Sequence, residues 1–273
     1  MASETSSDPA SWLEWDWFDA VDSSLRSATK LIRSADSREI SVLYPYLDSV
    51  LESNGSFRLL AHSERLRDAY VIARVIYETS LNGCFVLTNP RELSDRAATH
   101  ARQKALRNVV RAIEVAGETV LRVEMQGAEE LLQHPEHRKW LDEFTTKSGR
   151  EVASWTPENV PQRLEAVYQQ FGPSDSRGLA FGLLLYRHAS EIAHGTLFGT
   201  LFSWGAMELG ERLTGPEDLG VFRAKELKHL IKLVAHSNES VVRILSSVLC
   251  KPGLGSAVVE ARKAYYRQRE ADA

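Results

Sequence analysis

The sequence predicts an all-α fold, and two observations support this class. Apolar residues recur at the three- and four-residue spacing of amphipathic helices along most of the 273 residues. No run of alternating apolar and polar residues, bounded by hairpin turn signals, demands a sheet. The hydrophobic content of 43% is sufficient for one large core. We therefore expect a bundle of long antiparallel helices.

The first expected element is a helix that begins after Asp8-Pro9, whereas the serine-rich residues 1–10 are expected to be disordered. A second helical segment, residues 37–53, contains Pro45, which should kink or divide it. The turn residues of "NGS", 54–56, should end that segment. The apolar residues that define the first helix are Trp12, Leu13, Phe18, Val21, Leu25 and Ile32.

Two long helices are expected in the middle of the chain, over residues 62–88 and 90 to about 132. Asn89-Pro90 separates them, because the residue before a proline disfavours helix and proline itself favours a helix start. The pair should fold back as an antiparallel hairpin. Residues 151–163 hold two prolines and should form a loop that packs through Trp155.

In the C-terminal part of the chain we expect a short helix near 161–171, which ends at "FGPSDSRG". A further helix is expected over 176–194, and Gly195 should terminate it. Two further helices are expected at about 217–249 and 255–269, separated by "KPGLG". All these elements should form one helical domain over residues 1–273. In that domain the helices of residues 11–60 pack on a core of residues 62–249, and residues 252–273 add a last helix.

Composition limits the classes of partner and compartment. The net charge is −4 and the pI about 6.1, so no global basic field attracts nucleic acid or an acidic membrane. Cys84 and Cys250 stand alone, which fits neither a disulfide framework nor a zinc site and favours a reducing cytoplasm. The acidic first residues show neither the basic start nor the apolar core of a secretory signal, so we expect the protein to stay inside the cell. The apolar runs are shorter than the roughly 20 residues of a membrane span.

One apolar segment, "LLLYRHASEIAHGTLFG" at residues 183–199, carries an unusual concentration of polar groups. Because each helical residue advances by about 100°, Arg187, Glu191 and His194 fall within roughly 60° of one another. Tyr186 and Ser190 lie on the neighbouring strip. If this stripe is buried it needs partners, since each unpaired polar group costs on the order of 2–7 kcal/mol.

Partners for the stripe are available in the helix expected over residues 62–88. Arg74 and Glu78 are four residues apart, so the simplest expectation is an ion pair along their own helix. The alternative is a cross-helix pairing in which Glu78 meets Arg187 or His194.

These residues carry a resemblance. The combination of R-x3-E in "RVIYE" with Y-x3-S-x3-H-G in "YRHASEIAHG" resembles a bacterial family of unannotated helical proteins. The spacing of Arg187 and His194, with six residues between them, is similar to the signature of the HEPN superfamily, and His188 matches the polar residue that typically follows the arginine. The likeness covers residues 62–249. HEPN domains are antiparallel helical bundles, often dimeric, and many are metal-independent ribonucleases of toxin–antitoxin and antiphage defence systems.

The resemblance implies an endoribonuclease that needs neither a metal nor another cofactor, because RNA supplies its own nucleophile in the 2′-hydroxyl. His194 would move the proton and Arg187 would brace the phosphate, while Tyr186, Ser190 and Glu191 would position them. The implied partners are RNA, a second copy of the chain, and a cognate antitoxin or regulatory protein. The sequence contains no glycine-rich phosphate loop, no "GxSxG" and no "HExxH".

Two other functions compete with the nuclease. In the first, Arg187, Glu191 and His194 form a buried network that fixes helix register in a non-catalytic interaction or regulatory module. In the second, the polar stripe lines a pocket for a small ligand. The basic stretch of residues 96–111 is either an ordinary solvated helix or a surface that steers RNA. Its cationic residues are Arg96, Arg102, Lys104, Arg107 and Arg111.

Overall fold

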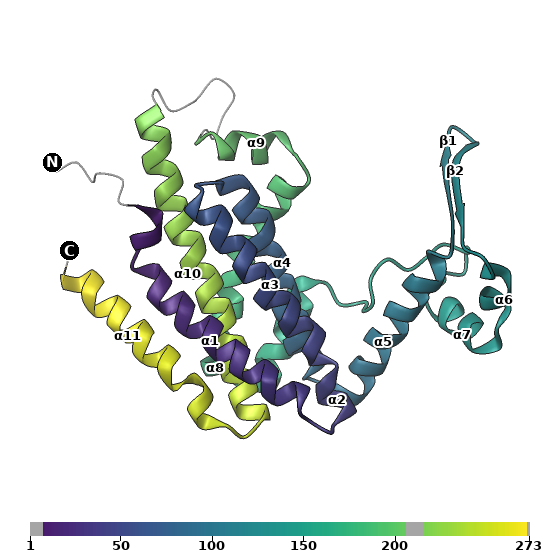
Figure 1. Ribbon diagram of the computed structural model, residues 1–273, viewed down its shortest axis with the longest axis horizontal. Coiled ribbons are helices and arrows are strands. Elements are labelled where there is room, and N and C mark those ends of the chain that lie inside the picture. Colours follow the sequence, from purple (N-terminus) through teal and green to yellow (C-terminus); the bar gives the residue numbers. More distant parts are fainter. Residues whose placement is uncertain (1–7, 206–215, 272–273) are drawn as a thin grey trace. The chain divides into compact units, whose positions relative to one another are not determined.

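The computed structural model describes residues 8–205 and 216–271, and these are mostly helical, which confirms the all-α class (Figure 1). Contacts group the chain into two compact units, which are described separately. The first unit combines residues 1–88 with 160–273, and the second consists of residues 89–159. The expected organisation as one domain over residues 1–273 stays a prediction.

The first unit is a bundle in which α10 packs against α1, α4 and α8 (Figure 1). The helix α3 packs on α4, and α11 packs on α1. Fully buried side chains from several helices form the core, among them Trp17, Phe57, Tyr77, Leu179 and Leu185. The elements are η1 (Pro9–Ser11), α1 (Glu14–Arg33), α2 (Arg38–Ser41), α3 (Leu43–His62), α4 (Leu66–Val86), α8 (Val160–Ala193), α9 (Leu197–Ser203), α10 (Pro216–Val248), η2 (Pro252–Gly255) and α11 (Ser256–Ala271).

The helix predicted after Asp8-Pro9 is confirmed as α1, which buries an apolar stripe, but it begins at Glu14, so Trp12 and Leu13 precede it. Of the segment predicted to be disordered, residues 1–7 lie outside the described residues, whereas Pro9 and Ala10 belong to the short helix η1. The division near Pro45 is also confirmed, because α2 ends at Ser41 and Pro45 lies in the first turn of α3, where its missing N–H costs nothing. The predicted end of this segment at residues 54–56 is wrong. Asn54 is buried inside α3, where its amide donates to Asp22 Oδ1 over 2.9 Å, so its side chain joins helices instead of ending one.

The helix α8 bends at the position that the sequence indicates. Gly172 has φ 75° and ψ 170°, which is accessible almost only to glycine, and Pro173 follows it inside α8. Two helical halves therefore meet there, as predicted. The predicted terminator Gly195 is also confirmed: its φ is 65°, its N–H donates to Ile192 O, and Thr196 N–H donates to Glu191 O, as in a Schellman motif.

The second unit corrects the prediction of one helix over residues 90–132. The helix α5 (Pro90–Arg107) ends early, and an antiparallel hairpin follows, formed by β1 (Val110–Val115) and β2 (Glu118–Glu124). Two short helices come next, α6 (Ala128–Gln133) and α7 (Pro135–Glu143). The helices on either side of Asn89-Pro90, α4 and α5, belong to different units. The expected antiparallel pair of these helices is therefore not found within either unit.

The hairpin could not be predicted from hydrophobic periodicity. Both of its faces are solvated, so neither strand alternates cleanly between apolar and polar residues. Its two-residue turn, Ala116-Gly117, has positive φ at both positions, 52° and 84°. This is the conformation of the tight turns that favour hairpins. Alanine at the first position removes the usual asparagine or aspartate signal. The loop predicted over residues 151–163 is confirmed up to residue 159, because α8 already begins at Val160. Within this loop the carbonyl of Trp155 accepts a hydrogen bond from Arg96.

Among the helices that the structure describes, none is both long and apolar enough to cross a bilayer.

Candidate functional sites on helix α8

The predicted polar face of α8 is solvent-exposed. Helical periodicity turns Leu185 and Ile192 into the core, and it leaves Arg187, Glu191 and His194 in solvent. Within the described part of the chain, no hydrogen bond or ion pair engages the side chains of these three residues. The interpretation as a buried network that fixes helix register is therefore not what the structure contains.

Tyr186 and Ser190 are half-buried on the adjoining strip of α8. The ring of Tyr186 packs against α4, where the Arg74 guanidinium carbon lies 5.0 Å from the ring centroid. Arg74 Nε lies 3.1 Å from Glu78 Oε1, so the pair predicted along α4 is confirmed. Glu78 orients Arg74, and the Arg74 guanidinium in turn packs over the ring of Tyr186. In the described residues Glu78 makes no pair with Arg187 or His194.

His188, which follows the arginine of the motif, is turned away from the exposed face. Its Nδ1 lies 3.1 Å from the carbonyl oxygen of Leu184, and its ring packs 5.6 Å from that of Phe202 on α9. The position of His188 indicates a packing role between α8 and α9.

Two arginines of the predicted RNA-binding stretch hold the second unit together. Arg96 Nε donates to the carbonyl oxygen of Trp155 over 2.8 Å. Arg107 Nη2 donates to the carbonyl of Phe144 over 3.2 Å and to Thr145 Oγ1 over 2.7 Å. Both guanidiniums therefore attach the chain that follows α7 to the helix α5.

The other three cations of this stretch also have partners inside the second unit. Lys104 forms an ion pair with Glu151, and the guanidinium of Arg102 lies 5.0 Å from the ring centroid of Trp140. Arg111 Nη1 donates to a side-chain oxygen three residues earlier in the chain. The arrangement resembles that of an ordinary structural helix, and the RNA-binding role of these residues stays a prediction.

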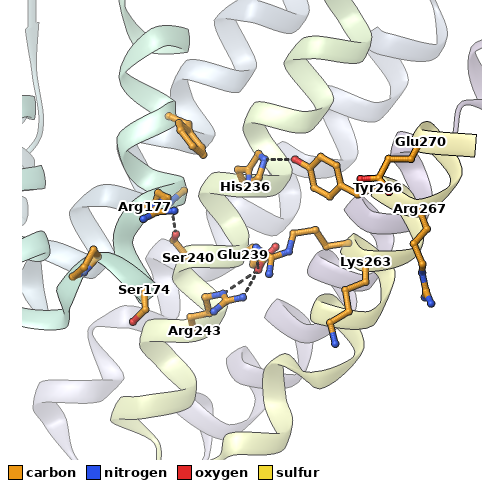
Figure 2. Close-up of a pocket in the computed structure, with 14 residues that line it drawn as sticks. Ser174, Arg177, His236, Glu239, Ser240, Arg243, Lys263, Tyr266, Arg267 and Glu270 are labelled. Atoms are coloured by element: carbon orange, nitrogen blue, oxygen red, sulfur yellow. Dashed lines mark hydrogen bonds and ion pairs between the residues drawn. The ribbon is translucent and has the colours of Figure 1, made fainter. Parts of the chain in front are cut away.

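A second candidate site, which we call the basic pocket, lies between α8, α10 and α11 and has a volume of about 810 Å³ (Figure 2). Two acidic residues, Glu239 and Glu270, line it together with a larger number of cations. The cations are Arg177, Arg243, Arg262, Lys263 and Arg267. This is a strong local excess of positive charge in a chain with a net charge of −4.

Glu239 organises the floor of the basic pocket. Its side chain is only 4% exposed, and its carboxylate accepts bonds from Arg243 over 2.8 Å and from Trp17 Nε1 over 3.1 Å. Arg262 from α11 lies 3.1 Å from the same carboxylate. One buried acid therefore holds two guanidiniums in fixed positions, which compensates its own desolvation.

An aromatic wall closes one side of the basic pocket. His236 Nε2 lies 3.3 Å from Tyr266 Oη (Figure 2). The centroid of the Phe181 ring lies 5.2 Å from that of the imidazole. Burial lowers the pKa of His236 to about 4, and the charges of Arg262 and Lys232 add to this effect. The imidazole is therefore neutral near pH 7.

The sequence offered only a weak signal for the basic pocket. Its residues come from three helices between positions 173 and 270, and only folding brings them together. The local hint is the cluster of cations and tyrosines in "EARKAYYRQRE", residues 260–270, which is also typical of a solvated helix. Among the described residues, no three histidine, cysteine or acidic side chains are grouped so that they could hold a metal ion.

The fold and these sites define a helical protein with an exposed arginine–histidine face and a separate cationic pocket on the same helix. A family model matches residues 41–207, and the chain belongs to this family, described as a family of unknown function (DUF5677). The matched region includes the polar face of α8, whereas α10 and α11 lie outside it. No curated protein and no solved structure matches the chain.

Proposed function

We propose that the protein is a metal-independent endoribonuclease of the HEPN type, which cuts RNA at the α8 face formed by Arg187, Glu191 and His194. One observation carries the proposal: the arginine and histidine of the motif share an exposed helix face and have no partner among the described residues. Exposed polar groups without a protein partner are available to bind a substrate, whereas the members of a structural network are buried and hydrogen-bonded to one another.

The spacing on α8 suits a phosphodiester. Arg187 and His194 are seven positions apart, which is close to two full turns and a rise of roughly 10 Å. Both side chains therefore leave the same side of the helix, and the long arginine can reach toward the histidine. Arginine can bind two phosphate oxygens at once and stabilise the charge that grows on them in the transition state.

The proposed reaction is an internal transfer. His194 removes the proton of the ribose 2′-hydroxyl, and the 2′ oxygen attacks the adjacent phosphorus. The bond from phosphorus to the 5′ oxygen breaks, and that oxygen takes a proton from water. The products are a 2′,3′-cyclic phosphate and a 5′-hydroxyl. Arg187 clamps the phosphate throughout, and Tyr186, Ser190 and Glu191 would contact and position the two reacting side chains once RNA is bound.

A homodimer would bring a second copy of these groups to the substrate. Two exposed apolar side chains lie just beyond the end of α8: Leu197 is 57% and Phe198 37% exposed. Such residues beside a polar face favour contact with another protein surface. The proposed biological setting is cytoplasmic, as a toxin or antiphage defence effector that a cognate antitoxin or regulatory protein restrains.

The test is incubation of the purified full-length protein with a mixed cellular RNA pool in excess chelator. The wild type should cleave RNA, and Arg187→Ala or His194→Ala should lower the rate by about 100-fold or more. Arg91→Ala is the matched control, because Arg91 is also an exposed arginine but lies on α5, and it should cleave like the wild type.

Cleavage that survives His194→Ala unchanged, in a variant with unaltered circular dichroism, would contradict the assignment. If no variant and no wild-type sample cuts RNA, the exposed face serves binding without chemistry, and the interaction module becomes the better function. Light scattering on the same samples measures the mass in solution and tests the proposed dimer.

A further inference from the structure

The basic pocket contains more positive charge than its own acids compensate. Glu239 already binds Arg243 and Arg262. Arg177 and Arg267 also line the pocket, and neither makes a hydrogen bond or an ion pair with another described residue. In a protein whose net charge is −4, unpaired cations around one cavity indicate an anionic ligand.

Lys263 can also contribute to such a ligand. It forms an ion pair with Glu260 over 2.9 Å, but the two side chains are 58% and 67% exposed. An exposed pair of this kind stabilises the protein little, so the ammonium group can turn to a phosphate at small cost. Arg177 belongs to α8, whereas Lys263 and Arg267 belong to α11, so the cations that line the cavity come from two helices (Figure 2).

Two side-chain links hold α11 beside α10 at the basic pocket. The helix α11 packs on α1, and side chains link it to α10, through the bonds of Arg262 to Glu239 and of Tyr266 to His236. The buried carboxylate of Glu239 makes the first of these two links. The link through Glu239 rests on a buried carboxylate and does not involve Arg177, Lys263 or Arg267, which would touch a ligand's phosphates.

The other wall of the cavity is aromatic. Phe181 and Tyr266 are 39% and 44% exposed, and the neutral imidazole of His236 lies between them. The same three side chains also line an adjoining pocket of about 470 Å³, together with Leu185 and Leu233. A planar ring can stack here, next to the region where the cations gather.

We propose that the basic pocket binds a nucleoside polyphosphate, with the phosphates at Arg177, Lys263 and Arg267 and the base against Phe181 and Tyr266. A volume of about 810 Å³ is far larger than a single phosphate needs and is within the usual range for small-molecule sites. Arginine matches phosphate through its planar fork of donors, and an aromatic wall accepts any base through its π face. The basic pocket shares no residue with the proposed nuclease face, so the inference does not depend on the proposed function.

The experiment is isothermal titration calorimetry of the full-length protein with ATP, GTP, tripolyphosphate and adenosine, at low ionic strength and in chelator. ATP or GTP should bind saturably with one ligand per chain and more tightly than tripolyphosphate or adenosine. Arg177→Ala and Arg267→Ala should each weaken ATP binding about tenfold or more, because each removes a charged bond to phosphate. Arg269→Ala is the matched control, since it removes an exposed arginine of α11 that does not line the pocket, and its affinity should stay within about twofold.

Phe181→Leu distinguishes the contribution of the base from that of the phosphates, because leucine keeps an apolar contact but removes the aromatic ring. This variant should weaken ATP about fivefold or more and leave tripolyphosphate within about twofold. Thermal unfolding without ligand verifies that each variant is folded. Absence of saturable ATP and GTP binding would overturn the proposal, as would an equal loss in Arg267→Ala and Arg269→Ala. Tripolyphosphate that binds as tightly as ATP, with no effect of Phe181→Leu, would also overturn it, since the ligand would then be an inorganic polyanion.

Discussion

Gly178 lies at a close approach between α8 and α10. A Cβ placed there would lie 2.0 Å from the carbonyl oxygen of His236 and 2.7 Å from Ser240 Oγ. The first of these contacts is with backbone, so the clash is relieved only if the two helices move apart. Gly178→Ala should therefore lower the free energy of unfolding by about 1–3 kcal/mol, measured by urea denaturation.

Gly55 supplies the matched control for that measurement. It is an exposed glycine inside α3, and a Cβ there would meet nothing within 4 Å. Gly55→Ala should raise the free energy of unfolding by about 0.5–1 kcal/mol, because alanine loses less conformational entropy in a helix. A Gly178→Ala protein as stable as Gly55→Ala would show that the two helices do not approach as closely as described.

His236 should make stability depend on pH. Its pKa falls from 6.5 to about 4 on folding, mainly through burial, so the unfolded chain binds more protons between these two values. Stability is then highest above about pH 6.5 and declines as the pH falls toward 4. Between pH 7 and pH 5 the urea midpoint of the wild type should drop more than that of His236→Gln. Equal drops would mean that the imidazole is not held neutral.

At the scale of elements, the hairpin carries backbone strain at one residue. Ala116 has φ 52°, a left-handed conformation that costs an alanine about 1–2 kcal/mol relative to glycine. Ala116→Gly should therefore slow amide hydrogen exchange in β1 and β2. The control is Ala112→Gly, in the middle of β1, which should accelerate exchange because glycine weakens a strand. Faster exchange in both variants would contradict the turn geometry.

Elements were predictable from sequence where the signal is local. The break in α8 is encoded by two adjacent residues, Gly172 and Pro173, and the end of that helix by Gly195, so both could be placed in advance. The continuation of α3 through residues 54–56 could not, because it depends on a bond from Asn54 to Asp22 on another helix. At this position the contact between two helices outweighed the local turn tendency of residues 54–56.

The same distinction separates the two candidate sites. The polar face of α8 follows from the period of a single helix, so its members could be grouped from the sequence, although their exposure could not. The basic pocket depends on α8, α10 and α11 meeting around Glu239, and nothing near Arg177 in the sequence indicates that Arg267 lines the same cavity. Local periodicity predicts faces of helices, whereas cavities require the packing between them.

At the scale of the whole molecule, the two units differ in the size of their cores. In residues 89–159 the buried apolar side chains are Leu106, Val109, Ala128 and Phe144. The first unit buries large aromatic and aliphatic side chains along α1, α3, α4, α8 and α10. Hydrophobic burial is the main favourable term in folding, so the second unit should be much the less stable of the two.

Native-state amide hydrogen exchange, read by mass spectrometry, tests this difference. Peptides from α5, α6 and α7 should exchange through local opening, at a lower free energy than peptides from α4 and α10, which should exchange only on global unfolding. Low urea should raise exchange in the second unit first. Phe144→Ala, which removes the one large side chain fully buried there, should widen the gap by about 3–5 kcal/mol or unfold that unit altogether, while α4 and α10 keep their protection. Equal protection in both units, or a loss of protection in α10 on Phe144→Ala, would mean that the chain unfolds as one cooperative body.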